Sequence, residues 1–593
     1  MKMHKKNMVF VLLLAAWFVP GAVCCAAEQY QKILIISSHE NETNRNLYRN
    51  ISTAFNNVKL NYRNVDAGSY EIGEELQRLK GDDLLIIATN DFVSIVCKSN
   101  IVRFVAEGGM VFFPILGTGS EAILNLAGVK STNGSEIVSG FSPTVKLFPG
   151  LEEPKIEPLG LRAGSLKVTF DKDVDVIVTA ENNFPLAWRY SFGKGKIMVL
   201  NSALLTNSRF CGVMMQLTSL LNDYFLTTVF NAKVVFIDNF PFPIPQRSDY
   251  VVSSNYDGMT YEEFYKEVWW PQIKDLSAKY NLKYTFMVLA SNDNSVTVPP
   301  VKVSDRTKEF IRYYGKDIIK SGHELGIHGY NNASLVLTQP VTADLKKNEQ
   351  QPWKSVQDME ASLVCLQKTL DETLGKMDYF TYVPPMNRLS KEGKSAVLKV
   401  FPGIKCFGGI ASFISDATGK KGGILYQEAG MDPDFPEVYD LPRTSYGEFY
   451  KTEELWRAYN YVAYYGLFSH SFHSDNLMYN ESSGNMNWLQ LHDSLDKIMG
   501  EVALKFPFLR SMTAREFVQE RFRTDKIKVY SHRKENEITV EYENGDGPLY
   551  HYLRLNNGKK VKEIKNGTFR TIDAEGGLYL LEGLKSPLLI TLE

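Results

Sequence analysis

The stretch Gly322-His323-Glu324-Leu325-Gly326-Ile327-His328-Gly329-Tyr330-Asn331-Asn332 is the most specific pattern in this 593-residue sequence. Three further segments accompany it, and each one ends or follows an expected strand. They are Ser254-Asn255-Tyr256-Asp257-Gly258, Phe380-Thr381-Tyr382-Val383-Pro384-Pro385 and Leu467-Phe468-Ser469-His470-Ser471-Phe472-His473-Ser474-Asp475. Sites of α/β barrels lie at the carboxyl ends of the strands, where such polar residues meet. The pattern therefore indicates one site built from distant segments.

In this order and context, the four segments resemble those of the NodB-type polysaccharide deacetylases, which are carbohydrate esterase family 4 and its relatives. The resemblance covers close to half of the chain. It implies a central (β/α) barrel, distorted and with fewer than eight strands, over residues 239–525. The barrel is expected to begin with a strand over residues 250–254.

The resemblance also implies a metal site, because in that family an Asp and two His hold a divalent cation, usually zinc. By position, Asp257 would bind the metal, His328 would be the first His ligand and Asn332 would stand at the second. The metal would polarise an acetamide carbonyl and activate a bound water. Outside this pattern, His328 would more often be a core histidine, and Asp257-Gly258 is also a common turn pair.

A late His protonates the leaving amine in that family, and here His470 or His473 would do so. Residues three apart on a strand point to opposite faces, so only one of them faces the pocket, and His473 is favoured because it lies nearer the strand end. Asp238, which follows an apolar run, is a candidate for the base, with a boundary turn as the alternative. The candidates for substrate contacts are Asn255, Tyr256, Pro385, Asp440, Arg443 and Asp475.

The sequence departs from the family pattern in ways that leave catalysis open. Asn332 replaces the second His, and an amide oxygen is a poorer zinc ligand than imidazole. Neither Asn255 nor Tyr256 supplies a base carboxylate, and Val383 stands where an Arg is common. A metal-dependent deacetylase and a non-catalytic polysaccharide-binding relative both remain hypotheses. Glycosidic hydrolysis would need two carboxylates across a sugar, and no recognisable pair is present among Asp257, Glu324, Glu428 and Asp440.

Residues 28–238 are expected to form an α/β domain with a parallel sheet. Continuous apolar runs such as Ile33-Leu34-Ile35-Ile36 are typical of strands buried on both faces. The arrangement resembles class I glutamine-amidotransferase-like (flavodoxin-like) folds, but no Gly-x-Cys-x-Gly motif is present. We therefore expect a structural or carbohydrate-docking role. Alternating segments with Gly/Asn turns in residues 526–593 predict a small β-sandwich.

The N-terminus predicts export. Lys2, Lys5 and Lys6 precede an apolar run and a small-residue stretch, which together describe a signal peptide over residues 1–27. A lipid attached to Cys24 or Cys25 is the less favoured alternative. The mature chain is expected to be secreted or periplasmic, to lack a membrane span and to act on a polysaccharide, with envelope polysaccharide export machinery as a candidate partner. The formal net charge of -2 gives no basic field for nucleic acid.

Overall fold

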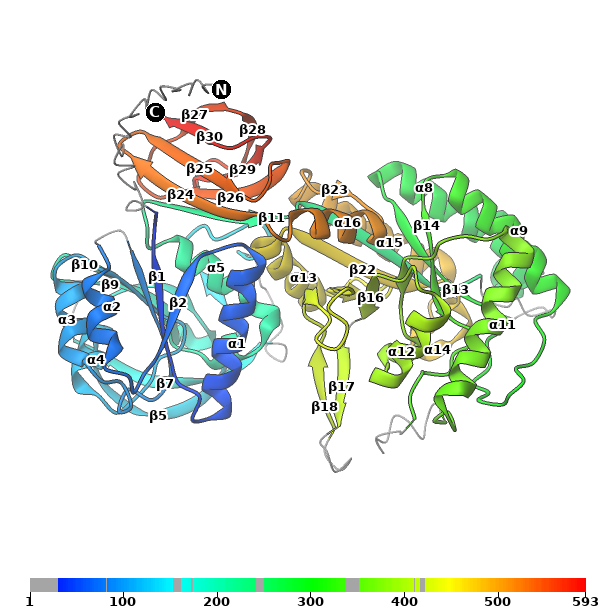
Figure 1. The fold of residues 1–593 in the computed structure, drawn as a ribbon, viewed down its shortest axis with the longest axis horizontal. Coiled ribbons are helices and arrows are strands. Elements are labelled where there is room, and N and C mark those ends of the chain that lie inside the picture. Colours follow the sequence, from blue (N-terminus) through cyan, green and yellow to red (C-terminus); the bar gives the residue numbers. More distant parts are fainter. Residues whose placement is uncertain are drawn as a thin grey trace, which may run out of the picture.

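The computed structural model describes residues 30–80, 83–152, 161–171, 174–241, 250–337, 351–409, 411–415 and 422–593. The expected signal peptide, with Cys24 and Cys25, lies outside these residues. Among the described residues, no helix combines the length and the apolar character that crossing a membrane requires. Figure 1 shows an N-terminal α/β region, a central α/β region beside it, and a C-terminal β region above the first.

The N-terminal sheet has a parallel half. β1 (Ile33–Ser37) lies between β2 (Tyr62–Asp66) and β3 (Leu84–Ala88), and every residue of β1 is buried. β4 (Met110–Phe113) and β10 (Gly195–Leu200) continue the parallel order. Three antiparallel strands complete the eight-stranded sheet, namely β9 (Pro185–Phe192), β8 (Asp175–Thr179) and β6 (Ser142–Pro143).

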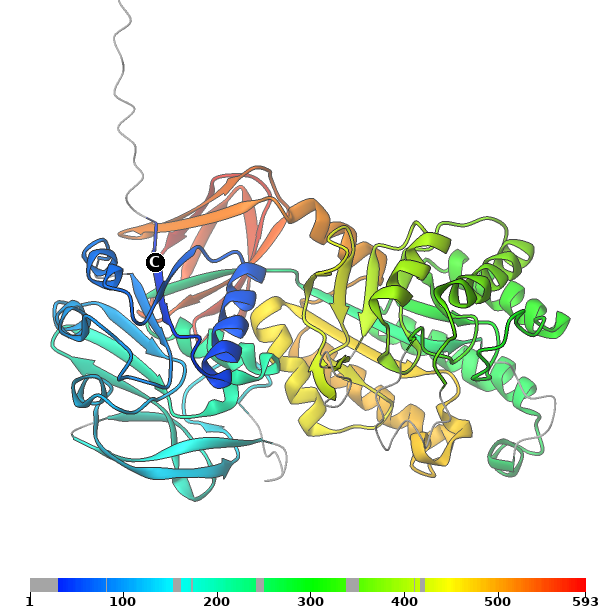
Figure 2. The same ribbon diagram turned by 60° about the horizontal axis from the view of Figure 1, so that its bottom comes forward.

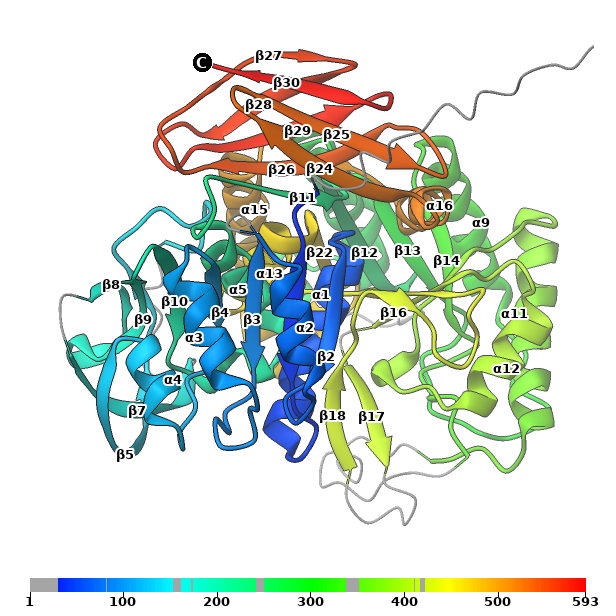
Figure 3. The same cartoon turned by 60° about the vertical axis from the view of Figure 1, so that its left-hand side comes forward.

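Helices cover both faces of this sheet. Ile33 and Ile35 of β1 share a buried cluster with Leu47 of α1 (Glu42–Asn57), whereas Leu34 and Ile36 share another with Ile72 of α2 (Glu71–Gln77) and Ile101 of α3 (Lys98–Ala106). Figure 3 shows α2 and α3 in front of the sheet. Alternate residues of a strand face opposite sides, so a strand covered on both sides must be apolar throughout. The flavodoxin-like region is thus confirmed.

The central region contains a curled sheet around β12 (Ala232–Phe240). β12 lies between β13 (Tyr284–Leu289) and β22 (Leu467–His473), and all three strands run parallel. Beyond β13 the parallel strands are β14 (Glu324–Gly329), β15 (Thr381–Tyr382), β16 (Cys406–Gly409) and β20 (Tyr439–Pro442), and beyond β22 lies β21 (Ser445–Tyr446). The described end strands do not pair with each other, so the barrel is open, in agreement with the expected distorted (β/α) barrel. The expectation of fewer than eight strands is wrong, because the described part of this sheet has ten strands.

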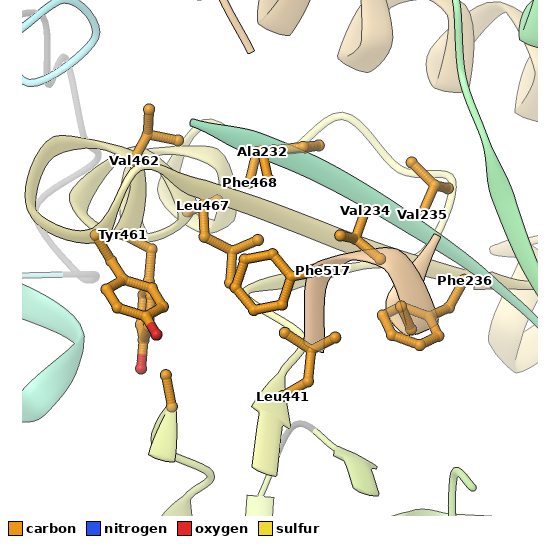
Figure 4. Packing of buried hydrophobic residues seen from close by; sticks show 14 of the residues in the cluster. Ala232, Val234, Val235, Phe236, Leu441, Tyr461, Val462, Leu467, Phe468 and Phe517 are labelled. Atoms are coloured by element: carbon orange, nitrogen blue, oxygen red, sulfur yellow. The ribbon is translucent and has the colours of Figure 1, made fainter. Parts of the chain in front are cut away.

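Helices between these strands and after β22 surround the sheet, as Figure 2 shows. They include α8 (Trp270–Tyr280), α9 (Asp305–Lys320), α11 (Val356–Leu374), α12 (Lys391–Val400), α13 (Thr452–Tyr465), α15 (Trp488–Lys505) and α16 (Ala514–Thr524). Figure 4 shows how β12, β20, β22 and α16 meet through Val234, Leu441, Leu467 and Phe517. These four side chains are fully buried. Each such burial stabilises the fold by roughly 2 kcal/mol, so the strands that carry the site rest on a rigid core.

The C-terminal region is a sandwich of two four-stranded sheets, as expected. One has the order β24 (Lys528–Lys534), β25 (Glu537–Glu543), β30 (Leu588–Leu592) and β27 (Val561–Lys565). The other has the order β11 (Tyr224–Val229), β26 (Leu549–Leu555), β29 (Leu578–Gly583) and β28 (Gly567–Asp573). Its first strand, β11, comes from residues that the sequence grouped with the N-terminal domain. Without β11, β26 would be an edge strand with unpaired backbone groups, and β11 pairs with these groups.

The expected strand over residues 250–254 is wrong. Residues Tyr250–Asn255 form helix α6, and the strand that leads into the central site is β12. The domain division between residues 238 and 239 stays a prediction, and it falls within β12. The apolar run Val234–Ile237 continues as strand through Phe240 because its backbone is paired on both sides.

The N-terminal and central regions pack closely through α5 (Cys211–Ser219) and α13. A Cβ atom on Gly212 would lie 2.4 Å from the backbone oxygen of Asn460. The Asn460 side-chain oxygen accepts a hydrogen bond from the Val213 backbone N–H at 3.0 Å. Only glycine permits so close an approach.

Candidate functional site

The site begins at an irregularity in β12. The register between β12 and β13 shifts between Ile237 and Phe240, and Asn239 adopts a left-handed backbone with φ 57°. Asn tolerates this conformation better than most residues. Such a bulge re-aims side chains next to a strand end. Here it carries Asp238 and Asn239, which are 1% and 7% exposed.

Asp238 contacts an arginine and a histidine from the ends of two other strands. Arg443, directly after β20, donates from its guanidinium to Asp238 Oδ2. His473, at the end of β22 and opposite Asp238 in the ladder, places Nε2 3.5 Å from the same oxygen. Arg443 also donates to the side-chain oxygen of Asn387 at 2.7 Å. Asp238 and Arg443 are both nearly inaccessible, so this is a buried ion pair.

These contacts shift two pKa values in opposite directions. Burial disfavours the charged form of Asp238, but the Arg443 guanidinium and the hydrogen bond from His473 outweigh it and hold the pKa of Asp238 well below its usual range. Burial also disfavours the His473 imidazolium, but the hydrogen bond and charge of Asp238 raise the pKa of His473 above its usual value. At neutral pH the pair is a carboxylate next to a histidine that holds its proton more tightly than usual.

His328 lies at the end of β14 and is 4% exposed. Its Nδ1 is 2.8 Å from the Val383 backbone oxygen. Burial lowers the pKa of His328 to about 4, with Asp238 opposing and His473 and Arg443 adding to the effect. A neutral His328 therefore donates from Nδ1 to the carbonyl, which leaves Nε2 as its acceptor.

Two more buried carboxyl groups interact electrostatically with His473. Asp475, 2% exposed, accepts both hydrogen bonds from the Asn239 amide nitrogen, at 3.1 and 3.2 Å. Burial raises the pKa of Asp475. Glu448, 1% exposed, accepts from Asn476 at 2.6 Å, and burial raises its pKa to about 7.

Two oxygens of the cluster keep unused acceptor capacity. Oδ1 of Asp238 and Oδ1 of Asn239 are buried and have no hydrogen-bond partner among the described groups. A buried acceptor without a partner is costly, so both oxygens favour a ligand or water that donates hydrogen bonds.

A cavity of about 570 Å³ opens at this end of the barrel. Arg443 and His473 contribute to its wall together with Asn387, Tyr446 and Asn476. Small-molecule sites are typically clefts of about 300–1,000 Å³ with a few polar groups fixing the ligand. The cavity is thus large enough for one or more sugar rings.

The structure separates Asp257 from the strand ends. Asp257 lies in an exposed turn between α6 and α7 (Tyr261–Phe264), with φ 47°, and the carboxylate that acts on the charge of His328 is Asp238. The predicted placement of Asp257 at a strand end is therefore wrong, because the residues before it are helical. Asn255 is exposed and accepts from Asn487 at 3.4 Å, while Tyr256 packs on Phe264 with ring centres 4.8 Å apart.

The remaining predicted site residues, Asn332, Pro385, Asp440 and His470, each have hydrogen-bond partners of their own. The Asn332 amide donates to Asn292 Oδ1 at 2.6 Å, and the Pro385 carbonyl accepts from Ser334 at 3.0 Å. Asp440 accepts from Gln427 at 3.0 Å, and burial, with Asp432 adding, raises its pKa to about 7. His470 is 1% exposed, lies 2.9 Å from Ser445 Oγ through Nδ1, and has its pKa lowered to about 3 by burial. Of the two late histidines, His473 is the one that contacts Asp238.

The residues present do not fit a zinc site. Asp238 Oδ2 is engaged by a guanidinium, and the amides Asn239 and Asn332 provide no negative charge or imidazole. In the part of the chain that the structure describes, no three His, Cys, Asp or Glu side chains are grouped so as to hold a metal ion. Zinc in proteins prefers thiolate, imidazole and carboxylate ligands. No catalytic step through a metal follows from this donor set.

Sequence reasoning missed Asn239, Asn387 and Glu448. Asn239 follows Asp238 directly, so an apolar run ending in Asp-Asn was an available signal. Asn387 comes just after the Pro384-Pro385 pair, within the 3₁₀ turn Pro385–Asn387. Nothing local distinguishes Glu448, because its role depends on contacts across the sheet.

The fold and the site define a class: a multidomain α/β protein with an open (β/α) barrel and a charge-paired polar site at the carboxyl ends of its strands. A family model described as "Uncharacterised protein conserved in bacteria (DUF2194)" matches residues 24–580, so the chain belongs to this family. No curated protein matches the chain in sequence.

Several solved structures are similar at low identity. A protein of Mycobacterium smegmatis described as a polysaccharide deacetylase is 16% identical, with a TM-score of 0.27 over 46% of this chain and 83% of that chain. A carbohydrate esterase family 4 pseudoenzyme of Bacillus anthracis is 10% identical, with a TM-score of 0.25 over 49% and 65%. A ThuA-like protein of Parabacteroides merdae is 11% identical, with a TM-score of 0.22 over 30% and 84%. At these TM-scores, none of the likenesses bears on the function of this chain.

Proposed function

We propose that this chain is an exported polysaccharide-binding protein whose deacetylase-like barrel has no metal-dependent deacetylase activity. The observation that carries the proposal is the buried pair of Asp238 and Arg443. The Arg443 guanidinium contacts the Asp238 carboxylate, which would otherwise be free to bind a metal cation or to activate a water molecule. A cationic neighbour opposes metal binding at the same carboxylate by charge repulsion.

The cavity supports a carbohydrate ligand. Sugar hydroxyls are donors as well as acceptors, and Ser471, His473 and Asn476 line the cavity with polar groups that can exchange hydrogen bonds with them. Tyr446 lines the cavity and is 47% exposed, and flat aromatic rings are suited to the apolar faces of sugars. The proposal of export depends on the signal peptide expected over residues 1–27. For an exported protein, the proposed ligand is an envelope polysaccharide, and the proposed partner is the machinery that exports this polysaccharide.

Metal content tests the proposal directly. We expect the mature chain, loaded with excess zinc and then dialysed, to retain far less than one zinc per chain by mass spectrometry. Asp257→Ala and His328→Ala should leave that content unchanged. One zinc per wild-type chain that is lost in His328→Ala would overturn the proposal.

Metal-assisted deacetylation is the second candidate. The retained His328 and His473 favour it, since both lie with Asp238 at one end of the barrel. Acetate release from chitotetraose by the zinc-loaded protein, abolished by His473→Gln, would establish it. Without such release, binding of an oligosaccharide measured by calorimetry would support the first proposal.

For location, the full chain and a chain lacking residues 1–27 can be compared by cell fractionation. The full chain should appear outside the cytoplasm and the truncated chain inside it.

A further inference from the structure

A second cavity, of about 410 Å³, lies between the N-terminal region and the C-terminal sandwich. Its wall comes from the start of β1, residues 58–63, the end of α2, and the strands β11 and β24. Figures 1 and 3 show β11 on the side of the sandwich that faces the N-terminal region. No residue lines both this cavity and the one that contains Arg443 and His473, so the two are separate.

The cavity lies along the outer edges of two strands. Among the described strands, β11 and β24 each end one sheet of the sandwich, so each has an edge without a neighbouring strand. In an antiparallel ladder, the backbone groups of alternate residues point to opposite edges. The Asn556 N–H donates to the Asp223 carbonyl across the ladder at 2.9 Å, whereas the Thr228 N–H donates to Val58, outside the sheet, at 3.1 Å. The backbone groups of Leu226 therefore also point outward.

The N-terminal region already fills one end of the opening between these edges. Besides the bond from Thr228, Lys59 Nζ donates to the Ile527 carbonyl at 2.8 Å, and Asn61 Nδ2 donates to the Val529 carbonyl at 2.9 Å. Residues 58–61 thus hydrogen-bond with the backbone of both edges. The cavity begins where these contacts stop.

The next outward-facing residues are Leu226 on β11 and Ser531 on β24, and both line the cavity. Leu226 is only 6% exposed, and its backbone N–H and C=O have no partner on the outer edge in the part of the chain that the structure describes. A buried backbone group without a partner is costly. The pair favours a ligand that offers an acceptor and a donor together, as a peptide backbone does.

The charged side chains in the wall are engaged within the protein. Lys59 donates to backbone carbonyls, and Lys32 Nζ donates to the Arg78 carbonyl at 3.3 Å. Glu75 pairs with Arg63 at 2.9 Å and with Arg78. The wall also contains the partly buried side chains of Leu60, Tyr62 and Leu79. It therefore suits an uncharged segment that carries an apolar side chain.

We propose that this cavity is a docking site for an extended, uncharged segment of a partner protein. The segment pairs with Leu226 on the outer edge of β11 and places an apolar side chain near Leu60 and Leu79. Strand addition of this kind gains affinity from backbone hydrogen bonds and specificity from side-chain pockets. A polypeptide is the favoured occupant because the site continues an interface that residues 58–61 of this chain already form with the same two edges.

A phage-displayed library of random seven-residue peptides, selected on the full mature chain, provides the probe. We expect the selection to enrich uncharged peptides with apolar side chains, and a synthesised member to bind in calorimetry. Methylation of its backbone nitrogens, one at a time, should identify a position at which the affinity falls about tenfold, because one backbone hydrogen bond is lost. If no peptide is enriched, or if no single methylation weakens binding, the proposal fails.

Two variants of one residue locate the binding. Leu226→Pro and Leu226→Ala both shorten the buried side chain, but only proline removes the N–H on the outer edge, and the ladder to β26 keeps its bonds. The selected peptide should bind Leu226→Pro about tenfold more weakly than Leu226→Ala. Thermal unfolding checks that both variants fold, and the methylation series does not depend on either of them. Equal affinities of the two folded variants would contradict the proposal.

Other occupants give different results. If a second copy of this chain fills the edge, sedimentation without peptide will show a wild-type dimer that persists in Leu226→Ala and dissociates in Leu226→Pro. If an N-acetylated sugar fills it, chitotetraose will bind more weakly to Leu226→Pro than to Leu226→Ala. Either result would overturn the assignment to a partner protein.

Discussion

Arg443 and Asp238 form an ion pair buried at the carboxyl ends of β20 and β12, 205 positions apart in the sequence. The guanidinium is 3% exposed at the side chain and the carboxylate 1%. Taking two charges out of water is costly, and a pair so buried is tolerated only with good geometry and further hydrogen bonds. Asn387 and His473 supply those bonds, so the pair organises the whole strand-end cluster.

Breaking this pair from one side should destabilise the protein strongly. We expect Arg443→Met to lower the free energy of unfolding by about 3–5 kcal/mol, because it leaves Asp238 as a buried charge without its main partner. The double variant Asp238→Asn/Arg443→Met should be less destabilised than the sum of the two single variants. Chemical denaturation measures all three, and strict additivity would show that the two groups do not interact in solution.

His473 should make stability depend on pH in a defined direction. Its folded pKa is raised, so its contribution is fully present below the unfolded value of about 6.5 and is lost as pH rises through the folded value. The stability difference between wild type and His473→Gln should therefore be larger at pH 6 than at pH 9. Asp475 and Glu448 remain in both proteins, so their own titration largely cancels in this difference. A difference that grows with pH would contradict the assigned contact with Asp238.

The variant Asn239→Asp tests whether the site binds zinc once a second carboxylate is present. The variant replaces an amide that donates to Asp475 with a second carboxylate, both in a buried setting. Two carboxylates this close cannot both ionise easily, so we expect a loss of about 2 kcal/mol at pH 7.5 and a smaller loss at pH 5. Zinc should not restore stability if the remaining groups lack the arrangement for a metal. Recovery with stoichiometric zinc uptake would instead favour the deacetylase alternative.

The contact between α5 and α13 should be sensitive to one methyl group. In Gly212→Ala the added Cβ would lie 2.4 Å from the Asn460 backbone oxygen, so the two helices must separate. Overpacking of this kind costs about 1–3 kcal/mol, which thermal unfolding can measure. Gly164→Ala is the matched control, because a Cβ atom there would meet open space, and it should leave the unfolding temperature unchanged.

The sequence alone determined the three-region α/β, (β/α)-barrel and β-sandwich plan, because apolar runs and alternating segments report directly which strand faces are buried. It also marked His328 and His473 through a local pattern. It misplaced the acid, since a short stretch such as Tyr250–Asn255 reads equally well as helix or strand. Tertiary structure decided that Asp238 faces His473, that Arg443 arrives from a strand over 200 residues later, and that β11 joins the C-terminal sheet. Those choices depend on strand pairing and on charges brought together by folding, which no local pattern encodes.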